Sequence, residues 1–574
     1  MCVGLLAGFS QEDDLPTAPL GDRPQRTTDL TELYGRRDAR ADSWGSEQIE
    51  SAVREAFGVW TSGLAAGETP QPATVDGQVV VTGRLEGKAN TGPGLSVERA
   101  VESPEELRLG FRAALDRALG LPEERGGWKV SVKTTAAKDI AGRWETEHVV
   151  EGTGAWEGEL LERHARWRCE WQPTGETDSE LQLRRIMVLE QSAGRSERKL
   201  FAEVTGAVFE GVESFEEQLT PGLEHWTSRV DRGLGMTLIG HEGIAVRDVD
   251  GDGLEDIYLP QPGGLPNRLY LRQPDGRVKD ASASSGLDFL DPSRSALFVD
   301  FDNDGDADLA VDLESALGLF ENDGHGKFRE RARFDLGSTT SLAAADIDLD
   351  GDLDLYACGY ILPDEAQVVP APYFDANNGR PNTLLRNDIS GEDWAFSDAT
   401  AEVGLDENNR RFSFAASFED LDADGDPDLY VANDFGRNNL FVNDGGRFRD
   451  HAARAGVEDV AAGMGVSFAD VDRDGDFDLH VSNMFSSAGE RVVADEQFSS
   501  VRDGATLGAY RRHARGNSLF LANGDGTFED ASGAAGVTLG RWSWGAVFCE
   551  LNNDGWPDLF VPNGFVTGRD PDDL

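Results

Sequence analysis

Acidic residues at alternate positions, interrupted by a glycine, recur six times between residues 248 and 558 of this 574-residue chain. Carboxylates packed this densely repel one another unless a cation lies among them. The runs begin 46 to 80 residues apart, so a repeated structural unit must surround each one. The pattern therefore predicts a repeat protein built around metal-binding loops.

The ligands can be assigned by position within each run. Carboxylates at positions 1, 3 and 5 converge on one point, the glycine at position 6 allows a sharp turn, and the side chain at position 9 closes the shell. The predicted ligands are Asp248, Asp250, Asp252 and Asp256; Asp300, Asp302, Asp304 and Asp308; Asp346, Asp348, Asp350 and Asp354; Asp420, Asp422, Asp424 and Asp428; Asp470, Asp472, Asp474 and Asp478; and Glu550, Asn552, Asp554 and Asp558.

The chemistry of these ligands favours Ca²⁺. Six to eight oxygens in a flexible loop suit Ca²⁺ better than Mg²⁺. No Cys or His lies inside any loop core, which argues against zinc. We expect about six Ca²⁺ sites, of which the sixth should bind most weakly because Glu550 and Asn552 replace two aspartates.

An EF-hand loop opens in the same way but requires a Glu at position 12 between two helices. Position 12 is apolar in all six runs: Leu259, Val311, Ala357, Val431, Val481 and Val561. The flanking residues alternate between apolar and polar as β-strands do. The EF-hand interpretation fails, and each loop is predicted to connect two strands of a β-hairpin.

Further segments recur after the loops. Examples are a short strand at Asn438-Asn439-Leu440-Phe441, a glycine turn ending in an aromatic residue at Asn443-Asp444-Gly445…Phe448, and a closing Gly456-Val457. Several short strands joined by Gly/Asn turns are typical of a propeller blade. The sequence predicts a mainly β fold in which residues 216–574 form a six- or seven-bladed β-propeller.

These units resemble the FG-GAP/VCBS repeats of integrin-alpha-type β-propellers. The chain from about Pro221 to Leu574 is similar to bacterial proteins related to cartilage acidic protein, notably at 240–245, 482–489 and 563–568. The resemblance implies seven blades with Ca²⁺ on one rim. Because only six loops are visible, a seventh blade would lack a loop or be shared between the two ends.

A smaller α+β domain is predicted over residues 46–215, after a flexible leader over residues 1–45. Helical spacing of apolar residues predicts a first helix around Ile49, Val53, Phe57 and Trp60. A second helix is predicted over 104–119, with a capping box at 103–106 and a stop at Gly120. Alternating apolar residues then predict four or five antiparallel strands, the last over 201–209.

One candidate for this domain is a curved sheet wrapped around a helix, similar to the NTF2-like cone, which often holds a pocket. Four strand residues could line such a pocket or lie on a solvated sheet face: His164, Arg166, Arg168 and Arg184. Residues 215–234 are predicted to form a helical joint into the first blade.

The charge balance restricts the partners. The chain has 106 acidic and 53 basic residues, a net charge of −53, which disfavours nucleic acid and anionic membrane surfaces. No stretch is apolar enough to cross a bilayer. The apolar run Met1–Phe9 could be the tail of a secretion signal, a segment with a lipidated Cys2, or an end without meaning.

The cysteines do not form a disulfide framework. The chain has four cysteines, widely spaced and without a CxxC motif. Cys358 and Cys549 lie in apolar strand segments and are predicted to be buried thiols. Compartment is inferred from calcium instead: loops of this kind outside the cell bind Ca²⁺ at roughly 10⁻⁴–10⁻³ M, so we expect a secreted, periplasmic or cell-surface protein.

Two connections are too long for a plain blade, at about 361–381 and 484–516. The second ends in a basic cluster at 511–515, which could bind an anionic ligand or pair with the protein's own acidic residues. Recognition in propellers falls on such loops.

We therefore expect a calcium-stabilised module for protein or glycan recognition and adhesion, with no catalytic residues and no organic cofactor. No catalytic motif such as HExxH, GxSxG or a P-loop is present. The alternatives are an enzyme with its active pocket in the N-terminal domain and the propeller as a targeting module, and a purely structural spacer.

Overall fold

The structure is a computed structural model. It describes residues 45–66, 78–85, 90–92, 95–122, 126–174, 181–197, 201–231, 243–313, 315–337, 339–360, 370–500 and 502–564. The predicted leader, with its Met1–Phe9 run, lies outside these ranges apart from Gly45. The chain divides into two compact units, one comprising 1–201 with 486–511 and the other 202–485 with 512–574.

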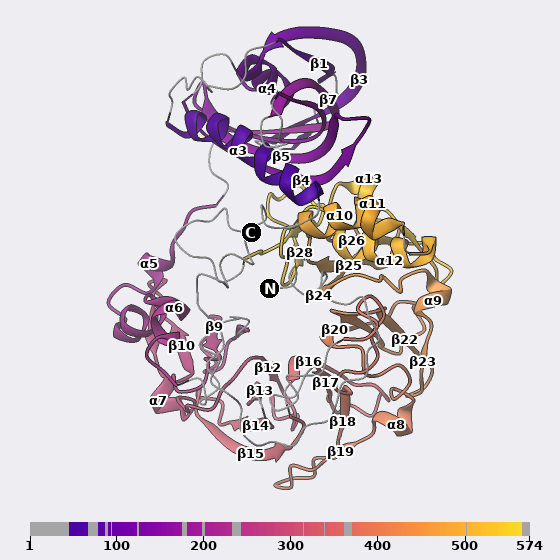
Figure 1. Cartoon of the computed structure of the whole chain (residues 1–574). Coiled ribbons are helices and arrows are strands. Elements are labelled where there is room, and N and C mark those ends of the chain that lie inside the picture. The colour runs from indigo at the N-terminus through magenta and orange to yellow at the C-terminus, as the bar shows by residue number, and fades with distance from the viewer. Residues whose placement is uncertain are drawn as a thin grey trace, which may run out of the picture. The chain divides into compact units, whose positions relative to one another are not determined.

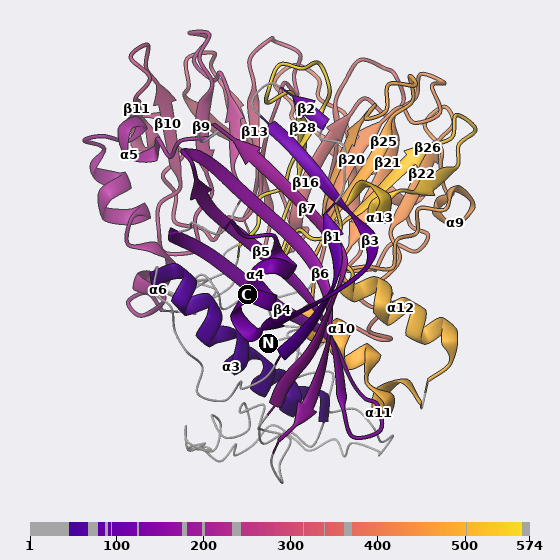
Figure 2. The ribbon, with the colours of Figure 1, turned by 90° about the horizontal axis from the view of Figure 1, so that it is seen from above.

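The first unit is an α+β fold, as predicted. A seven-stranded sheet has the order β2-β3-β1-β7-β6-β5-β4, antiparallel except between β1 and β7; its long strands run side by side in Figure 2. The elements are α3 (Gly45–Ala66), β1 (Gln78–Leu85), β2 (Asn90–Gly92), β3 (Leu95–Gly110), α4 (Phe111–Leu119), β4 (Gly126–Asp139), β5 (Trp144–Trp156), β6 (Glu159–Pro173) and β7 (Leu181–Ser196).

The core of this unit joins helix α3 to the sheet. The apolar stripe of α3 that the sequence predicted is buried, with Phe57 packing edge-on against Trp171 and His148. Trp167 and Trp171 of β6 are 0% and 1% exposed. Burial of large aromatic side chains of this kind contributes about 1.5–3 kcal/mol each, so α3 is held by packing rather than by helix propensity.

The second predicted helix is shorter than expected. Residues 103–110, which include the predicted capping box, are the end of strand β3, and α4 begins only at Phe111. The predicted stop is confirmed, because Gly120 adopts a left-handed φ of 68° at the helix end. Pairing of β3 with β1 and β7 overrides the local capping signal, since tertiary contacts outweigh propensity.

The insertion after strand β25 belongs to the first unit. It forms α10 (Ser487–Ala494), α11 (Glu496–Ser499) and the start of α12 (Gly504–Ala514). Arg491 of α10 is 6% exposed and donates to both carboxylate oxygens of Glu47, at 3.2 and 3.1 Å, and to the carbonyl of Thr134 at 2.8 Å. This insertion is therefore part of the packed structure of the first unit.

The second unit opens with short helical segments. The predicted helical joint is confirmed by η2 (Phe215–Leu219) and α6 (Gly222–Thr227). The strand predicted over 201–209 is wrong, since residues 205–208 form helix α5 (Thr205–Val208). Phe209 does not alternate along a sheet; it stacks on Phe215 and meets Tyr270 edge-on.

Six small antiparallel sheets follow within the described residues, five of four strands and one of two. They are β8 (Ala245–Arg247), β9 (Asp256–Leu259), β10 (Arg268–Arg272), β11 (Val278–Asp280); β12 (Ala296–Val299), β13 (Asp308–Asp312), β14 (Leu317–Asn322), β15 (Phe328–Phe334); β16 (Thr339–Ala345), β17 (Asp354–Gly359), β18 (Thr383–Asn387), β19 (Phe396–Asp398); β20 (Ser413–Glu419), β21 (Asp428–Asn433), β22 (Asn439–Asn443), β23 (Phe448–Asp450); β24 (Gly463–Ala469), β25 (Asp478–Asn483), β26 (Ser518–Ala522), β27 (Phe528–Asp530); and β28 (Val547–Cys549) with β29 (Asp558–Phe560).

These sheets have the size and strand order of propeller blades. The first strands of successive sheets contact one another, from β8 and β12 through to β24 and β28, and Figure 1 shows β12, β16 and β20 toward the inside with β15, β19 and β23 toward the outside. One-turn helices follow four of the outer strands: α7 (Ser282–Ser285), α8 (Thr400–Val403), α9 (Ala452–Ala455) and α13 (Ser532–Ala535).

Two further sequence predictions concern membranes and thiols. Among the described residues, no helix is long and apolar enough to cross a bilayer. Cys169, Cys358 and Cys549 are free thiols. Cys358 is fully buried as predicted, whereas Cys549 is only half-buried because it lies in the two-stranded sheet.

Candidate metal centres

Each acidic run connects the first and second strands of a sheet, as predicted. The six connections join β8 to β9, β12 to β13, β16 to β17, β20 to β21, β24 to β25 and β28 to β29, and every one of these pairs is antiparallel. The two paired strands fix both ends of the loop. Side chains from the two ends therefore meet over a short turn.

The backbone of the loops explains the glycine at position 6. Its φ lies between 81° and 102° in all six loops, a region that side chains with a Cβ rarely adopt. Position 4 is also left-handed, although five of the six residues there are not glycine: Asn303, Leu349, Ala423, Arg473 and Asn553. Two left-handed residues around position 5 turn the chain back so that alternate carboxylates face one point.

The structure brings three carboxylates together in each of the first five loops. In every cluster, one oxygen from each residue lies within 4.8 Å of the others. Positions 1 and 3 belong to all five clusters, joined by position 5 or position 9. The clusters are Asp248, Asp250 and Asp256; Asp300, Asp302 and Asp304; Asp346, Asp348 and Asp350; Asp420, Asp422 and Asp428; and Asp470, Asp472 and Asp478.

The remaining predicted ligands of these loops lie beside the clusters. Asp252, Asp308, Asp354, Asp424 and Asp474 complete the pattern in sequence but do not fall within the same short separation. In the fourth loop, the amide of Asp426 donates to Asp424 Oδ1 at 3.0 Å, and the amide of Gly425 donates to Asp420 Oδ2 at 3.1 Å. Such bonds orient the carboxylates, and each oxygen keeps a further lone pair for a cation.

The aspartate at position 9 anchors its loop to the sheet. Asp428 Oδ2 accepts from the amide of Leu421 at 3.0 Å, and its Oδ1 accepts from the amide of Asn443, in the third strand, at 2.8 Å. Equivalent hydrogen bonds occur at Asp256, Asp308, Asp354 and Asp478, where Oδ2 accepts from an amide of the loop and Oδ1 from an amide at the third strand. Position 9 therefore ties the loop to both its own turn and the third strand.

Electrostatics in the loops favours a bound cation. Burial raises the pKa of Asp256 and Asp354 to about 6 and that of Asp308 and Asp428 to about 7. Burial, with the neighbouring carboxylates, also raises the pKa of the position 3 residues Asp250, Asp302, Asp348 and Asp422. A divalent ion would remove this destabilisation of the charged form.

Sequence reasoning missed three asparagines that link one blade to the loop of the preceding blade. Asn322 Nδ2 donates to the carbonyl of Val249 at 2.9 Å, and Asn387 Nδ2 donates to that of Phe301 at 2.8 Å. Asn443 Nδ2 donates to the carbonyl of Ile347 at 2.9 Å. An Asn-Asp pair at the end of each third strand was the available signal, but it reads equally well as a turn.

The sixth loop differs from the others. Its three carboxylates Glu550, Asp554 and Asp558 do not form a cluster as tight as the other five within the described residues. The longer Glu550 side chain accepts from the amides of Asp554 and Gly555, and Asn552 Nδ2 points to Asp558 Oδ1 at 3.4 Å. Glu550 thus keeps the two backbone hydrogen bonds that Asp346, Asp420 and Asp470 accept in their loops, whereas Asn552 removes one negative charge and adds a side-chain contact.

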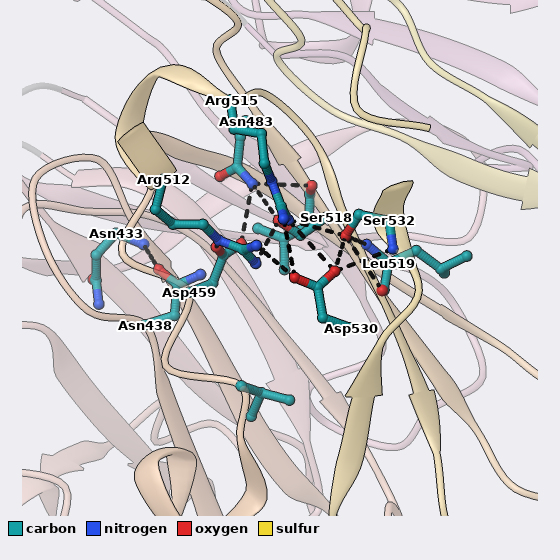
Figure 3. A network of polar contacts seen from close by, with 12 residues as sticks. Asn433, Asn438, Asp459, Asn483, Arg512, Arg515, Ser518, Leu519, Asp530 and Ser532 are labelled. Carbon is teal, nitrogen blue, oxygen red and sulfur yellow. Dashed lines mark hydrogen bonds and ion pairs between the residues drawn. The ribbon is translucent and has the colours of Figure 1, made fainter. Parts of the chain in front are cut away.

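The basic cluster at 511–515 pairs with the protein's own acids. Arg512 donates to Asp459 Oδ1 at 2.5 Å and to Asp530 Oδ2 at 2.6 Å, and Arg515 donates to Asp530 Oδ2 at 3.1 Å, as Figure 3 shows. Burial alone would raise the pKa of Asp530, but hydrogen bonds from Ser532 and Arg515 and the charge of Arg512 hold it well below its usual range. Internal pairing, one of the two alternatives from sequence, accounts for both arginines.

The described part of the first long connection packs on aromatic residues of later blades. Tyr373 contacts Phe435 and His513 edge-on, with ring centroids 5.1 and 5.0 Å apart. Nearby, the Tyr360 hydroxyl donates to buried Asp434 at 2.6 Å, and burial raises the pKa of Asp434 to about 7. The first nine residues of this connection, 361–369, lie outside the described residues.

The four strand residues considered for an N-terminal pocket lie on a partly exposed sheet face. Arg168 donates to Glu147 at 2.7 Å, Arg166 lies 3.6 Å from Glu190, and His164 lies 3.1 Å from Glu162. Arg184 is exposed. Arg166 and Arg168 are held in cross-strand ion pairs, and His164 lies beside Glu162 of its own strand, which agrees with a solvated face.

Fold and site together define a class: a repeat protein of small antiparallel sheets, each bearing an acidic loop between its first two strands. The chain carries FG-GAP-like repeats, because the model of the FG-GAP-like repeat matches residues 248–311, 420–481 and 505–561. These three regions contain five of the six acidic loops: the first, second, fourth, fifth and sixth. The resemblance expected from sequence is thereby confirmed at the level of the repeat.

Comparison with other proteins adds little beyond the repeat. No curated protein matches the chain. An Agrocybe aegerita lectin that recognises non-reducing terminal N-acetylglucosamine is 16% identical, with 57% of this chain and 76% of the lectin covered and a TM-score of 0.32. A Lactobacillus plantarum protein is 12% identical, with 65% of this chain and 95% of that protein covered and a TM-score of 0.23. The Pseudomonas aeruginosa periplasmic gluconolactonase PpgL is 11% identical, with 65% of this chain and 95% of that protein covered and a TM-score of 0.22. At these TM-scores no functional argument follows.

Proposed function

We propose that this chain is a calcium-binding recognition and adhesion module that acts outside the cytoplasm, with its Ca²⁺ ions in a structural role. The observation that carries the proposal is the convergence of three carboxylates within 4.8 Å in each of five equivalent loops. Five separate loops that each bring positions 1 and 3 together with a third carboxylate are hard to explain by surface acidity alone.

The donor set supports Ca²⁺ over other cations. Every side-chain ligand is an oxygen, and the loops add backbone carbonyls that can extend the shell beyond six. The open, partly exposed turns tolerate the irregular geometry that Ca²⁺ accepts and Mg²⁺ does not. Such sites fill at the millimolar calcium of extracytoplasmic spaces, which supports secretion, a periplasmic location or display on the cell surface.

A structural role follows from what the loops connect. Each loop joins the two inner strands of its sheet. In the five four-stranded sheets position 9 also reaches the third strand, and three asparagines bond the next blade to the loop. Neutralising the loop charge therefore stabilises hydrogen bonds that hold both the blade and its neighbour. The recognition surface would then be a rigid scaffold, as in other repeat proteins.

Recognition of a protein or glycan is favoured over catalysis by the state of the ionisable groups. Of the four strand residues that could have formed an N-terminal active pocket, Arg166, Arg168 and His164 lie beside carboxylates on a partly exposed face. The basic cluster that could have bound an anion is engaged by Asp459 and Asp530.

The test is calcium binding by metal-stripped protein, measured by calorimetric titration and by thermal melting. The proposal predicts saturable binding of several ions and a rise in melting temperature. Melting curves that superimpose with and without chelator contradict it. A glycan array and a pull-down with the full chain, each run with and without Ca²⁺, then identify the class of partner.

A further inference from the structure

Three buried asparagines take part in a relay of hydrogen bonds that passes from one acidic loop to the next. Asn322 shows a single step of this relay. Its Nδ2 donates to the carbonyl of Val249, at position 2 of the first loop, at 2.9 Å. Its backbone amide donates to Oδ1 of Asp308, the position 9 aspartate of the second loop, also at 2.9 Å. One residue of the second sheet therefore bonds to two neighbouring loops.

The position 2 residue continues the relay inside each loop. The amide of Val249 donates to Oδ2 of Asp256, the position 9 aspartate of the first loop, at 3.0 Å, while the carbonyl of Val249 accepts from Asn322. Because Val249 bonds to the carboxylate on one side and to the asparagine on the other, an ordering of the Asp256 carboxylate acts directly on the next sheet.

The same step repeats without interruption from the first loop to the fourth. Asn322, Asn387 and Asn443 are 3%, 4% and 0% exposed, so water does not compete for their bonds and successive bonds can strengthen one another. Every hydrogen bond of the relay is 2.8 to 3.2 Å long. In order, the relay comprises Asp256, Val249, Asn322, Asp308, Phe301, Asn387, Asp354, Ile347, Asn443, Asp428 and Leu421.

The relay stops at the fifth sheet. Ala522 occupies the position of the three asparagines, and its amide donates to Oδ1 of Asp478 at 2.9 Å, as theirs do to their own position 9 aspartates. The methyl side chain of Ala522 has no donor, and no hydrogen bond among the described residues carries the relay from the Leu421 carbonyl into the fifth sheet. Within the fifth loop, the amide of Val471 donates to Asp478 at 2.8 Å in the usual way. The fifth loop thus keeps the internal bonds of the others without the link to the preceding loop.

We propose that the first four acidic loops bind Ca²⁺ cooperatively through this relay, whereas the fifth loop binds Ca²⁺ independently of them. Ordering of one position 9 carboxylate by a bound ion also orders the position 2 residue and the asparagine that holds the next carboxylate. The next loop is then closer to its bound geometry, which raises its affinity. This inference concerns the regulation of the calcium sites and rests on the proposed function.

Amide hydrogen exchange reports on each loop separately. Five amides each donate to the position 9 aspartate of their own loop, those of Val249, Phe301, Ile347, Leu421 and Val471, so the protection of each should rise as its loop fills. The full chain is stripped of metal and titrated with Ca²⁺ alone. The first four amides should gain protection over one shared calcium range with a Hill coefficient above 1, and the fifth with a Hill coefficient of about 1.

Matched substitutions at position 3 test the coupling between loops. Asp302→Ala removes a ligand of the second loop, and Asp472→Ala removes the equivalent ligand of the fifth. Asp302→Ala should raise the calcium concentration that protects Val249 and Ile347 by at least about fivefold, the lower end of ordinary coupling between sites, and should leave Val471 unchanged. Asp472→Ala should leave the first four loops unchanged.

A substitution that restores the missing donor tests the route. Ala522→Asn should extend the relay to the Leu421 carbonyl, so that Asp472→Ala in this background raises the calcium concentration that protects Leu421 by a similar factor of at least about five. Without Ala522→Asn, Asp472→Ala should not move that concentration. Failure of Ala522→Asn to couple the two loops would overturn the relay as the route.

Three further results would overturn the proposal: independent titration of the first four amides, one shared titration of all five, or an equal shift at Val471 and Ile347 in Asp302→Ala. The second and third would assign the coupling to the unit as a whole. Absence of calcium-dependent protection in every loop would overturn the calcium proposal together with the relay. Calcium binding without the coupled shifts would overturn the relay alone.

Discussion

Replacement of Asn443 by alanine tests whether neighbouring blades are coupled through the acidic loops. Asn443 is 0% exposed, and its Nδ2 donates to the carbonyls of Ile347 in the third loop at 2.9 Å and of Pro427 at 3.2 Å. Its backbone amide, which the variant keeps, donates to Asp428. The substitution therefore removes the links to the preceding loop and to the carbonyl of Pro427, together with the hydrogen bond from the Gly446 amide to Asn443 Oδ1 at 2.9 Å within the same turn.

The expected cost follows from the two carbonyls. Leaving a buried polar group unsatisfied costs about 1–3 kcal/mol, and the small cavity adds to it. We expect the free energy of unfolding of the calcium-loaded protein to fall by about 2–4 kcal/mol, taking the two carbonyls together. The variant should also bind calcium more weakly in the third loop, because binding and loop order are linked.

The assay is urea unfolding at saturating calcium, with Asn523→Ala as the matched control. Asn523 occupies the corresponding turn of the fifth blade, but its side chain is exposed and donates only to Thr527 at 3.1 Å among its described contacts. The control should change the free energy of unfolding by less than about 0.5 kcal/mol. If Asn443→Ala costs no more than the control, the loops are not coupled through this side chain.

Three further predictions address the metal sites and the first unit. Asp348→Ala should lower the number of calcium ions bound per chain by roughly one, because Asp348 belongs to a three-carboxylate cluster. Asn552→Ala should change the calorimetric stoichiometry little, and equal effects of the two variants would contradict the ranking of the loops. In metal-free protein the pKa values of Asp256 and Asp354 are about 6 and those of Asp308 and Asp428 about 7, above the ordinary 3.8. These groups therefore favour folding at low pH and lose that contribution as pH rises through 6 to 7. The calcium-induced rise in melting temperature should be larger at pH 8 than at pH 5, and the reverse order would refute the assignment. Arg491→Met should destabilise the protein by about 3 kcal/mol by leaving Glu47 buried without its partner, against a small effect of Arg54→Met, whose side chain is 66% exposed; matching urea midpoints for the two variants would show that the insertion does not hold the first unit.

The parts of the fold that sequence predicted are those set by local pattern. The spacing of carboxylates around Gly425, for example, specifies the turn and the alternation of the flanking strands within a dozen residues, so both the hairpin and the cluster at Asp420 follow directly. The stripe from Ile49 to Trp60 likewise needs only the period of a helix.

The parts that sequence missed depend on distant contacts. Residues 103–110 carry a good capping signal, yet they pair with β1 and β7 as strand β3. Nothing near Arg491 indicates that its partner is Glu47, 444 residues away. The links from Asn322, Asn387 and Asn443 to a preceding loop span 73 to 96 residues, and a local Asn-Asp pair does not distinguish them from turn residues.

The most direct test of the central claim is a count of calcium ions bound per chain, by equilibrium dialysis of metal-stripped protein in millimolar calcium. Five loops gather three carboxylates each, and the sixth departs from the ligand pattern at Glu550 and Asn552. The account predicts five to six ions per chain, released together with a fall in melting temperature. A count near zero, with unchanged melting, would show that the carboxylates coexist without a cation and would contradict the account.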